Sequence, residues 1–120
     1  MKYTPRSKIN QDVARHVMGW KLLRDVSRPT WRDVEGKYMF PAHDLGSREG
    51  AFGFNPAERI EHAMMVLDKF YDWILSKNTC VCVHCSVWSS GMQKAVGALG
   101  KTREHAICLA ALRAKGVEGY

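Results

Sequence analysis

The stretch from residue 79 to residue 116, TCVCVHCSVWSSGMQKAVGALGKTREHAICLAALRAKG, decides the fold of this chain. Its first part, residues 79–88, is rich in Val and Cys, which predicts a β-strand. Alternate residues of a strand point to opposite faces, and neither face here carries Lys, Arg, Asp or Glu. We therefore expect both faces of the strand to be covered, with Val81 and Val83 buried beneath helices.

The residues that follow complete a hairpin and a helix. Ser89-Ser90-Gly91 predicts a turn, after which residues 94–99 pair back as a second strand. Thr102 is a natural N-cap for a helix that extends to Ala114, and Gly116 is suited to end that helix in a left-handed turn. The deciding stretch is therefore predicted to form a β-hairpin followed by a helix.

Two further helices are predicted upstream of the hairpin. Apolar residues at near-four-residue spacing predict a helix over residues 7–18, with Ser7 as its N-cap and Gly19 at its end. A second apolar stripe predicts a helix over residues 56–77, for which Asn55 is the natural N-cap.

The segment between these two helices differs in character. Residues 25–53 hold two prolines and four glycines and lack a sustained period, so they are predicted to form a long loop or irregular insertion. Residues 20–22 are expected to begin a short strand, and a strand or hairpin is expected around residues 37–40. The order of elements fits a small sheet with helices laid on it, in one domain over residues 1–120.

Composition limits the partners and the compartment. The net charge of +6 favours anionic partners, although the basic residues are scattered and form no run. No apolar segment approaches the roughly 20 residues that cross a bilayer, and the N-terminal residues lack the apolar part of a signal peptide. We expect a cytoplasmic protein that does not bind membranes.

One local pattern suggests metal binding. In Cys80-x-Cys82-x-His84, alternate residues on one strand face can bind one ion together, but zinc needs a third or fourth ligand. His43 and Cys108 are the available candidates, and neither lies at a signature spacing. We therefore expect free thiols, no metal site and no cofactor.

No catalytic constellation is recognisable in the sequence. A cysteine nucleophile needs a base beside it, and the spacing of the histidines assembles none. The paired carboxylates, Glu58 with Glu61 and Asp68 with Asp72, have the spacing of a solvated helix face. The chain also lacks a P-loop, a dinucleotide fingerprint and a nucleophile elbow. The sequence therefore favours a binding protein over an enzyme.

Three segments together resemble the phage ABA-sandwich domain family of small phage and prophage proteins. They are VARHVMGWKL at residues 13–22, FNPAERIEHAMMVLDKF at residues 54–70 and TREHAICLAALRAKG at residues 102–116. The resemblance covers about two-thirds of the chain, and residues 27–53 depart from it most. It implies an α/β fold built as a three-layer α-β-α sandwich, with a small sheet, a β-hairpin and three helices. It also implies expression in an infected bacterial host.

The resemblance implies little chemistry, but an analogy suggests a function. Small phage proteins of comparable architecture include the Thoeris anti-defence sponges, which bind cyclic nucleotide-derived immune signals without cleaving them. Because fold does not determine function, this is an analogy and not a motif match.

The best features for an anionic ligand lie at turns and helix starts. Lys101 and Arg103 flank the start of the last helix, where free N–H groups and the helix dipole favour anions. Phe54 and Trp88 lie in aromatic turns, and an aromatic ring stacked on a base contributes roughly 1–3 kcal/mol. Arg48 precedes the first aromatic turn, and the weakest candidate is Arg113 near the end of the last helix.

These observations lead to a hypothesis about function. We expect a phage anti-defence protein that sequesters a small anionic nucleotide signal, either a cyclic ADP-ribose isomer or a cyclic oligonucleotide. Because a domain of 120 residues leaves little room for a deep pocket, we also expect a homo-oligomer, most simply a dimer. The alternatives are a nucleic-acid-binding phage accessory protein and a phage structural or protein-interaction module.

Overall fold

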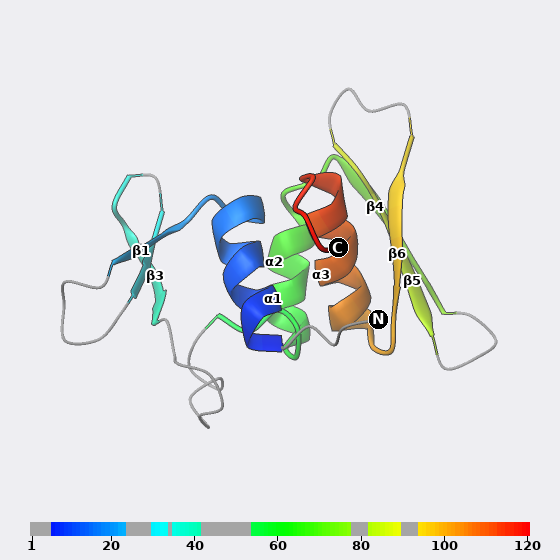
Figure 1. The fold of residues 1–120 in the computed structure, drawn as a ribbon, viewed down its shortest axis with the longest axis horizontal. Coiled ribbons are helices and arrows are strands. Elements are labelled where there is room, and N and C mark those ends of the chain that lie inside the picture. The colour runs from blue at the N-terminus through cyan, green and yellow to red at the C-terminus, as the bar shows by residue number, and fades with distance from the viewer. Residues whose placement is uncertain (1–5, 24–29, 34, 42–53, 78–81, 90–93) are drawn as a thin grey trace.

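Groups of three short strands alternate with helices along the described chain, and three helical segments lie between two small sheets (Figure 1). The computed structural model describes residues 6–23, 30–33, 35–41, 54–77, 82–89 and 94–120. The helical elements are α1 (Arg6–Asp12), continued by one π-helical turn η1 (Val13–Val17), α2 (Ile60–Leu67) and α3 (Arg103–Ala114). The strands are β1 (Lys21–Leu23), β2 (Thr30–Arg32), β3 (Tyr38–Pro41), β4 (Asp72–Lys77), β5 (Val83–Trp88) and β6 (Val96–Gly100).

The predicted α/β sandwich is confirmed. In the described residues the layers run in the order sheet, helices, sheet, with β1-β2-β3 on one side of the helices and β4-β5-β6 on the other (Figure 1). The layer order differs from the expected α-β-α, because β1, β2 and β3 form a second sheet where a loop was predicted. Both sheets are antiparallel. Helix α3 packs directly on β5 and β6, and α1 and α2 pack on α3. None of the described helices is long and apolar enough to cross a membrane.

The first helix forms as predicted, and its ends explain its length. Ile9, Val13 and Val17 form a buried stripe. Gly19 has a φ of 74°, which allows the amide N–H of Trp20 to donate to the carbonyl of Ala14 at 2.9 Å. The helix begins at Arg6, so the residue predicted as its N-cap lies inside the first turn.

The second helix is much shorter than predicted. Asn55 accepts backbone bonds of a turn, but α2 begins only at Ile60 and ends at Leu67. Residues 72–77, which were predicted to continue the helix, form β4 and pair with β5 along their whole length. This part of the prediction was wrong because Trp, Ile and Leu satisfy a strand as well as a helical stripe, and pairing with a neighbouring strand decides between them.

The long segment at residues 25–53 contains more structure than predicted. The expected strands near residues 20–22 and 37–40 are present as β1 and β3, but β2 between them was missed. Trp31 of β2 is buried against the helical layer, with the guanidinium of Arg15 5.7 Å from its ring. Residues 24–29 and 42–53 lie outside the described residues.

The hairpin and the last helix form as the deciding stretch predicts. β5 is the central strand, paired with β4 on one side and β6 on the other. The amide N–H of His105 donates to the Oγ1 atom of Thr102 at 3.1 Å, so Thr102 caps α3. Gly116 has a φ of 71° and ends the helix. Val83 is buried as predicted, while Val81 lies outside the described residues.

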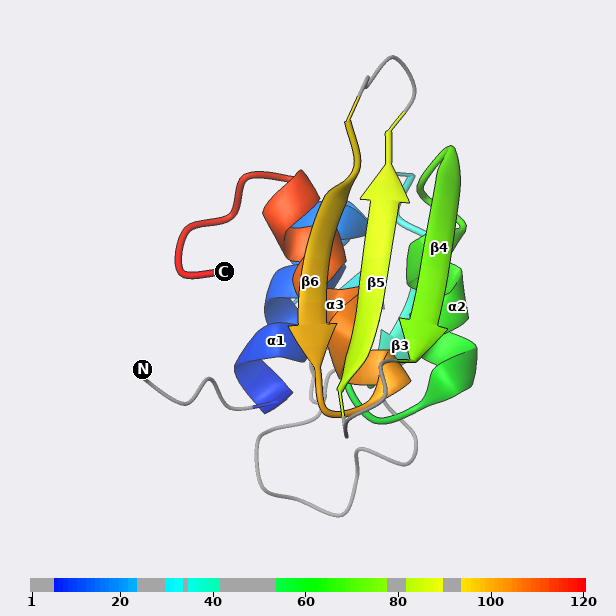
Figure 2. The same cartoon turned by 90° about the vertical axis from the view of Figure 1, so that its right-hand side faces the viewer.

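Only one face of the β4–β6 sheet is covered by the described residues. Val83, Cys85 and Val87 of β5 point inward and are buried beneath α3. The alternate residues of β5 are only half-buried, and Figure 2 shows their side of the sheet facing outward with no helix over it. The prediction that both faces are covered was therefore wrong for the described part of the chain, because a run without charges does not by itself require burial on both sides.

Candidate ligand-binding face

The outer side of the β4–β6 sheet is the most distinctive surface of the described structure. We call it the open face. The strand register places its residues in three rows across the sheet: Asp72 with Trp88; Ile74, Ser86 and Gly97; and Ser76, His84 and Leu99. Because alternate residues share a face, all these positions point away from the helices.

Gly97 gives the middle of the open face its shape. A Cβ atom at this position would lie 2.7 Å from Nε2 of His84 and 3.3 Å from Oγ of Ser86. The imidazole of His84 therefore lies against the bare backbone of Gly97, beside the hydroxyl of Ser86. This arrangement presents a ring nitrogen and a hydroxyl on a shallow surface, both of which can hydrogen-bond a polar ligand.

The borders of the open face are apolar and charged. Ile74 and Leu99 are each 54% exposed, on the strands to either side of β5. Asp72 is exposed at one end of the sheet. At the other end, Lys101 follows β6 directly and Arg103 begins α3, and both side chains are exposed. The two predicted cations therefore lie at the end of the sheet that holds His84.

The predicted site residues do not all meet within one chain. Trp88 lies at the opposite end of β5 from the strand end beside Lys101, because Val83 pairs with Gly100. Five strand steps of about 3.3 Å separate those two ends. Trp88 is half-buried on the open face. A ligand that touches both ends would therefore have to extend along β5.

The other predicted residues lie elsewhere. Phe54 is buried, with its ring centroid 4.7 Å from that of Trp20 and 5.5 Å from that of His62. Arg113 donates to the carbonyl oxygens of Gly97 and Tyr120, both at 3.0 Å, at the edge of β6. Arg48 lies outside the described residues.

Sequence reasoning missed Ser86 and Gly97 and considered His84 only as a metal ligand or a base. The available signal was the alternation along β5, where polar His84 and Ser86 interrupt a run of Val and Cys. The role of Gly97 had no local signal, because the strand register alone brings it opposite Ser86.

The cysteines and histidines do not gather into a metal site within the described residues. That part of the chain holds no group of three or more His, Cys, Asp or Glu side chains able to bind one ion. His84 and Cys82 are half-buried, and Cys108 is buried in α3 on the inner side of the sheet. Cys80 and His43 lie outside the described residues.

Burial also makes two of the thiols unreactive. It raises the pKa of Cys85 to about 11 and raises the pKa of Cys108 still further. Both thiols are therefore protonated at neutral pH, and a protonated thiol is a poor nucleophile. These two side chains act as small apolar residues of the core.

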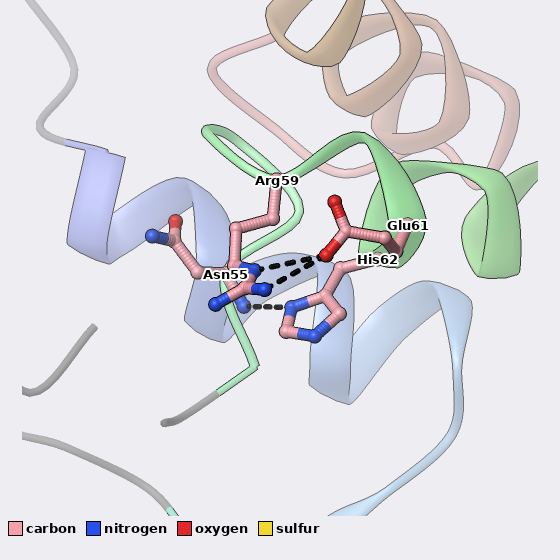
Figure 3. A network of polar contacts seen from close by, with 4 residues as sticks. All are labelled: Asn55, Arg59, Glu61 and His62. Atoms are coloured by element: carbon pink, nitrogen blue, oxygen red, sulfur yellow. Dashed lines mark hydrogen bonds and ion pairs between the residues drawn. The ribbon is translucent and has the colours of Figure 1, made fainter. Parts of the chain in front are cut away.

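A second polar cluster lies in the turn before α2 and in the first turn of that helix, where Figure 3 shows Asn55, Arg59, Glu61 and His62. The amide N–H of Asn55 donates to Nδ1 of His62 at 2.8 Å. Arg59 and Glu61 form an ion pair at 2.8 Å. The side chain of Asn10 donates to Oδ1 of Asn55 at 2.8 Å and so ties this turn to α1.

The titration behaviour of this second cluster suits a structural role. Burial lowers the pKa of His62, and the neighbouring charge of Arg59 lowers it further. The hydrogen bonds from Arg59 lower the pKa of Glu61. Neutral His62 uses Nδ1 to hold the turn before α2, so the cluster fixes the entrance to that helix.

The described residues form a small α/β sandwich with two antiparallel sheets, and the β4–β6 sheet has an open face. The sequence pattern of the phage ABA sandwich domain matches residues 11–112, and the chain belongs to that family. A solved structure of a phage protein from Bacillus cereus ATCC 14579 has the same fold, with a TM-score of 0.69 and 18% sequence identity. The match covers 100% of this chain and 95% of that protein. No curated protein sequence matches the chain.

Proposed function

We propose that this phage protein binds a small anionic nucleotide signal of host immunity on its open face and sequesters it without cleaving it. The candidate ligands are cyclic ADP-ribose isomers and cyclic oligonucleotides. The observation that carries the proposal is the arrangement of His84, Ser86 and Gly97, which presents polar groups on a sheet face that no described helix covers.

The chemistry of the open face suits a nucleotide-derived ligand. Trp88 offers an aromatic surface, and stacking on a base contributes roughly 1–3 kcal/mol. His84 and Ser86 offer hydrogen-bonding groups for a ribose or a base. Lys101 and Arg103 lie at the His84 end of the sheet, where they can attract phosphate groups. A ligand with a base at one end and phosphate groups at the other would match this surface, which has Trp88 at one end of β5 and Lys101 and Arg103 beside the other.

Several observations favour retention of the ligand over turnover. The thiols of Cys85 and Cys108 are protonated and buried. Nδ1 of His62 accepts a backbone hydrogen bond, and its cluster lies at the start of α2 and not on the open face. A protein that sequesters a signal needs affinity and slow release, for which no nucleophile is required.

A thermal-shift assay tests the proposal. The protein is mixed with cyclic ADP-ribose isomers and with cyclic oligonucleotides, and its melting temperature is compared with that of the free protein. A ligand at 100 times its Kd stabilises the protein by about 2.7 kcal/mol, which such an assay detects. The protein is then denatured, and the released compound is analysed by mass spectrometry; we expect it unchanged.

Variants locate the binding surface. Trp88→Ala and Arg103→Ala are expected to reduce the shift, whereas Lys69→Ala, which removes an exposed cation beyond the end of α2, is expected to preserve it. No shift with any of these compounds would contradict the proposal for them, and recovery of a cleaved compound would show an enzyme.

Nucleic acid is the alternative ligand, favoured by the net charge of +6. The open face itself contains no Lys or Arg, and the described cations are spread over helices and strands on several sides. Filter binding of DNA and RNA across a salt series distinguishes this function, because phosphate contacts give a steep dependence on salt. Salt-sensitive binding without any response to small nucleotides would favour the alternative.

A further inference from the structure

The sequence of β6 favours a strand less than those of β4 and β5. Its five residues, VGALG, include two glycines, and glycine weakens a strand because it has no side chain to pack. Among the described residues β6 pairs only with β5, so its other edge has no partner strand. Gly97, in the second position of β6, must therefore be held in place by contacts of its backbone.

Arg113 of α3 makes such a contact at the outer edge of β6. Its Nη1 atom donates to the carbonyl oxygen of Gly97, and its Nε atom donates to the carbonyl oxygen of Tyr120, both at 3.0 Å. The planar guanidinium presents its N–H groups in fixed directions, so one side chain can bridge two carbonyl groups. Arg113 thereby connects β6 to the segment that follows α3, which Figure 2 shows beside β6.

The segment that Arg113 holds is also attached to α1. The hydroxyl of Tyr120 donates to Oδ2 of Asp12 at 2.7 Å, and Nζ of Lys8 donates to the same oxygen at 2.7 Å. Hydrogen bonds to an ionised carboxylate are stronger than those between neutral groups. A continuous set of hydrogen bonds therefore runs from Asp12 in α1 through Tyr120 and Arg113 to Gly97 in β6.

The Gly97 end of this set lies at the open face. A Cβ atom at Gly97 would lie 2.7 Å from Nε2 of His84 and 3.3 Å from Oγ of Ser86. The imidazole of His84 therefore rests on the strand backbone whose carbonyl Arg113 holds. A movement of Gly97 would change the surface beneath the imidazole, and with it the position of the ring.

We propose that Arg113 is a positioning residue for the open face. It acts through Gly97 and fixes the backbone on which His84 rests, whereas the sequence predicted Arg113 as a direct ligand contact. Because Arg113 also holds Tyr120, it couples the open face to the contact between Tyr120 and α1. The positioning is a property of the free protein, and only its effect on a ligand rests on the function proposed above.

The imidazole signals of His84 in the free protein are the first measurement. Arg113→Gln removes the bridge, because the glutamine side chain is shorter and cannot reach both carbonyl groups. We expect the ring signals of His84 to shift in the nuclear magnetic resonance spectrum, although neither the ring itself nor any aromatic neighbour has been replaced. A loss of stability alone would leave the ring signals of the folded protein where they are.

Coupling is tested with a second substitution, because a continuous set of contacts does not by itself demonstrate it. Tyr120→Phe removes the bond to Asp12 but leaves the carbonyl group of residue 120 for Arg113. We expect it to shift the His84 signals in the same direction as Arg113→Gln, by a smaller amount. In the Arg113→Gln background the effect of Tyr120→Phe should fall to less than about half, because the connecting side chain is gone.

Two further variants separate the bridge from its charge. Lys115→Gln removes another exposed cation from the same end of α3, where Nζ of Lys115 lies 5.7 Å from the centre of the Phe70 ring. It is expected to leave the His84 signals unchanged. Arg113→Lys keeps the charge but has a single donor atom and cannot bridge both carbonyl groups, so it should resemble Arg113→Gln. Circular dichroism identifies the folded variants.

Affinity for a cyclic ADP-ribose isomer is the second measurement. Arg113→Gln is expected to raise the Kd by at least about fivefold, the size of one lost hydrogen bond. Tyr120→Phe is expected to raise the Kd by less. If the wild type does not bind this compound but the His84 signals shift as expected, the positioning is supported and only the proposed ligand is rejected.

Three outcomes would overturn the proposal. Unchanged His84 signals in the folded Arg113→Gln and Arg113→Lys variants would show that the bridge does not position the ring. An effect of Tyr120→Phe that is equally large with and without Arg113 would exclude coupling through this side chain. A raised Kd without any change in the free protein would make Arg113 a direct ligand contact.

Discussion

The two faces of the β4–β6 sheet are built from the same strands but differ in how their side chains are buried. On the inner face, Val83, Cys85 and Val87 are buried under α3. On the outer face, His84 and Ser86 are half-buried and no described helix covers them. The inner face is therefore optimised for packing, while the outer face retains polar groups that packing does not use. The difference indicates which side of the molecule is available for a ligand.

Two glycines of β6 show the same difference between the inner and the outer face of the sheet. A Cβ atom at Gly100 would lie 2.5 Å from the backbone nitrogen of Ala106 in α3. A Cβ atom at Gly97 would instead meet the end of the His84 side chain at 2.7 Å. Gly100 allows a helix to approach the sheet, and Gly97 allows a side chain to lie on it. Substitutions at these positions should therefore have different consequences.

The largest effect is expected for Gly100→Ala. The new methyl group meets the backbone of α3, which can move only if the helix shifts away from the sheet. We expect the free energy of unfolding to fall by about 3 kcal/mol, as in other overpacked cores. Urea unfolding of the two proteins measures this difference. A loss below about 1 kcal/mol would mean that α3 is less tightly packed on the inner face than the structure indicates.

A smaller loss of stability is expected when the hydrogen bond between Tyr120 and α1 is removed. The hydroxyl of Tyr120 donates to Oδ2 of Asp12 at 2.7 Å, and Nζ of Lys8 donates to the same oxygen at 2.7 Å. Tyr120→Phe removes one charge-assisted hydrogen bond and should cost about 1.5 kcal/mol at pH 7.

This cost should depend on pH. Burial alone would raise the pKa of Asp12, but the hydrogen bonds from Lys8 and Tyr120 outweigh it, and the net pKa is below the ordinary value of 3.8. A lowered acid pKa contributes stability above the unfolded pKa, and that stability is lost as the pH falls through the folded pKa. The difference between wild type and Tyr120→Phe should shrink below about pH 4. A difference unchanged at pH 2.5 would contradict this explanation.

A third prediction concerns the helical layer that supports the inner face. Neutral His62 accepts a hydrogen bond from the amide N–H of Asn55, and burial lowers the pKa of His62 below 6.5. The unfolded chain therefore gains a proton near pH 6.5 that the folded protein resists, so stability falls as the pH drops below that value. We expect a loss of up to about 1 kcal/mol by pH 5, the size of one hydrogen bond.

His62→Asn is the matched variant for this prediction. The Oδ1 atom of Asn can accept the same bond but does not titrate. Thermal melts from pH 7.5 to pH 5 should therefore show a smaller decline for His62→Asn than for wild type. Parallel declines in the two proteins would assign the pH dependence to other groups.

The smallest effect on stability is expected for Gly97→Ala. The new methyl group displaces the end of the His84 side chain, which can rotate because no described helix covers this face of the sheet. We expect the free energy of unfolding to change by less than about 0.5 kcal/mol, as at other surface positions. A loss comparable to that of Gly100→Ala would show that the outer face is as tightly packed as the inner one.

Local sequence signals predicted the inner face well. The Val and Cys run of β5, the Thr102 cap and the left-handed glycines at positions 19 and 116 all act within a few residues, and each formed as expected. The same kind of signal failed at β4, where residues 72–77 fit a helical stripe and a strand equally well. The segment is a strand and not a helix because it pairs with β5, and the local sequence does not reveal that pairing.

The candidate site likewise depends on contacts between strands, which the local sequence does not reveal. Gly97 comes opposite Ser86 only through the register of β5 and β6, and His84 reaches it across the sheet. Phe54 was predicted as a ligand contact because an aromatic residue in a turn looks available, but packing against Trp20 and His62 buries it. Sequence identifies side chains suited to a ligand, and tertiary packing decides which of them remain accessible.

Amide chemical shifts, recorded while a cyclic ADP-ribose isomer is added to the isotope-labelled protein, test the central claim most directly. If the open face binds the ligand, the largest changes should occur at His84, Ser86, Trp88 and Gly97, and they should be lost in the folded Gly97→Ala variant. Changes confined to the region around Phe54 and His62 would contradict the account, because they would place the ligand at the start of α2 and not on the open face.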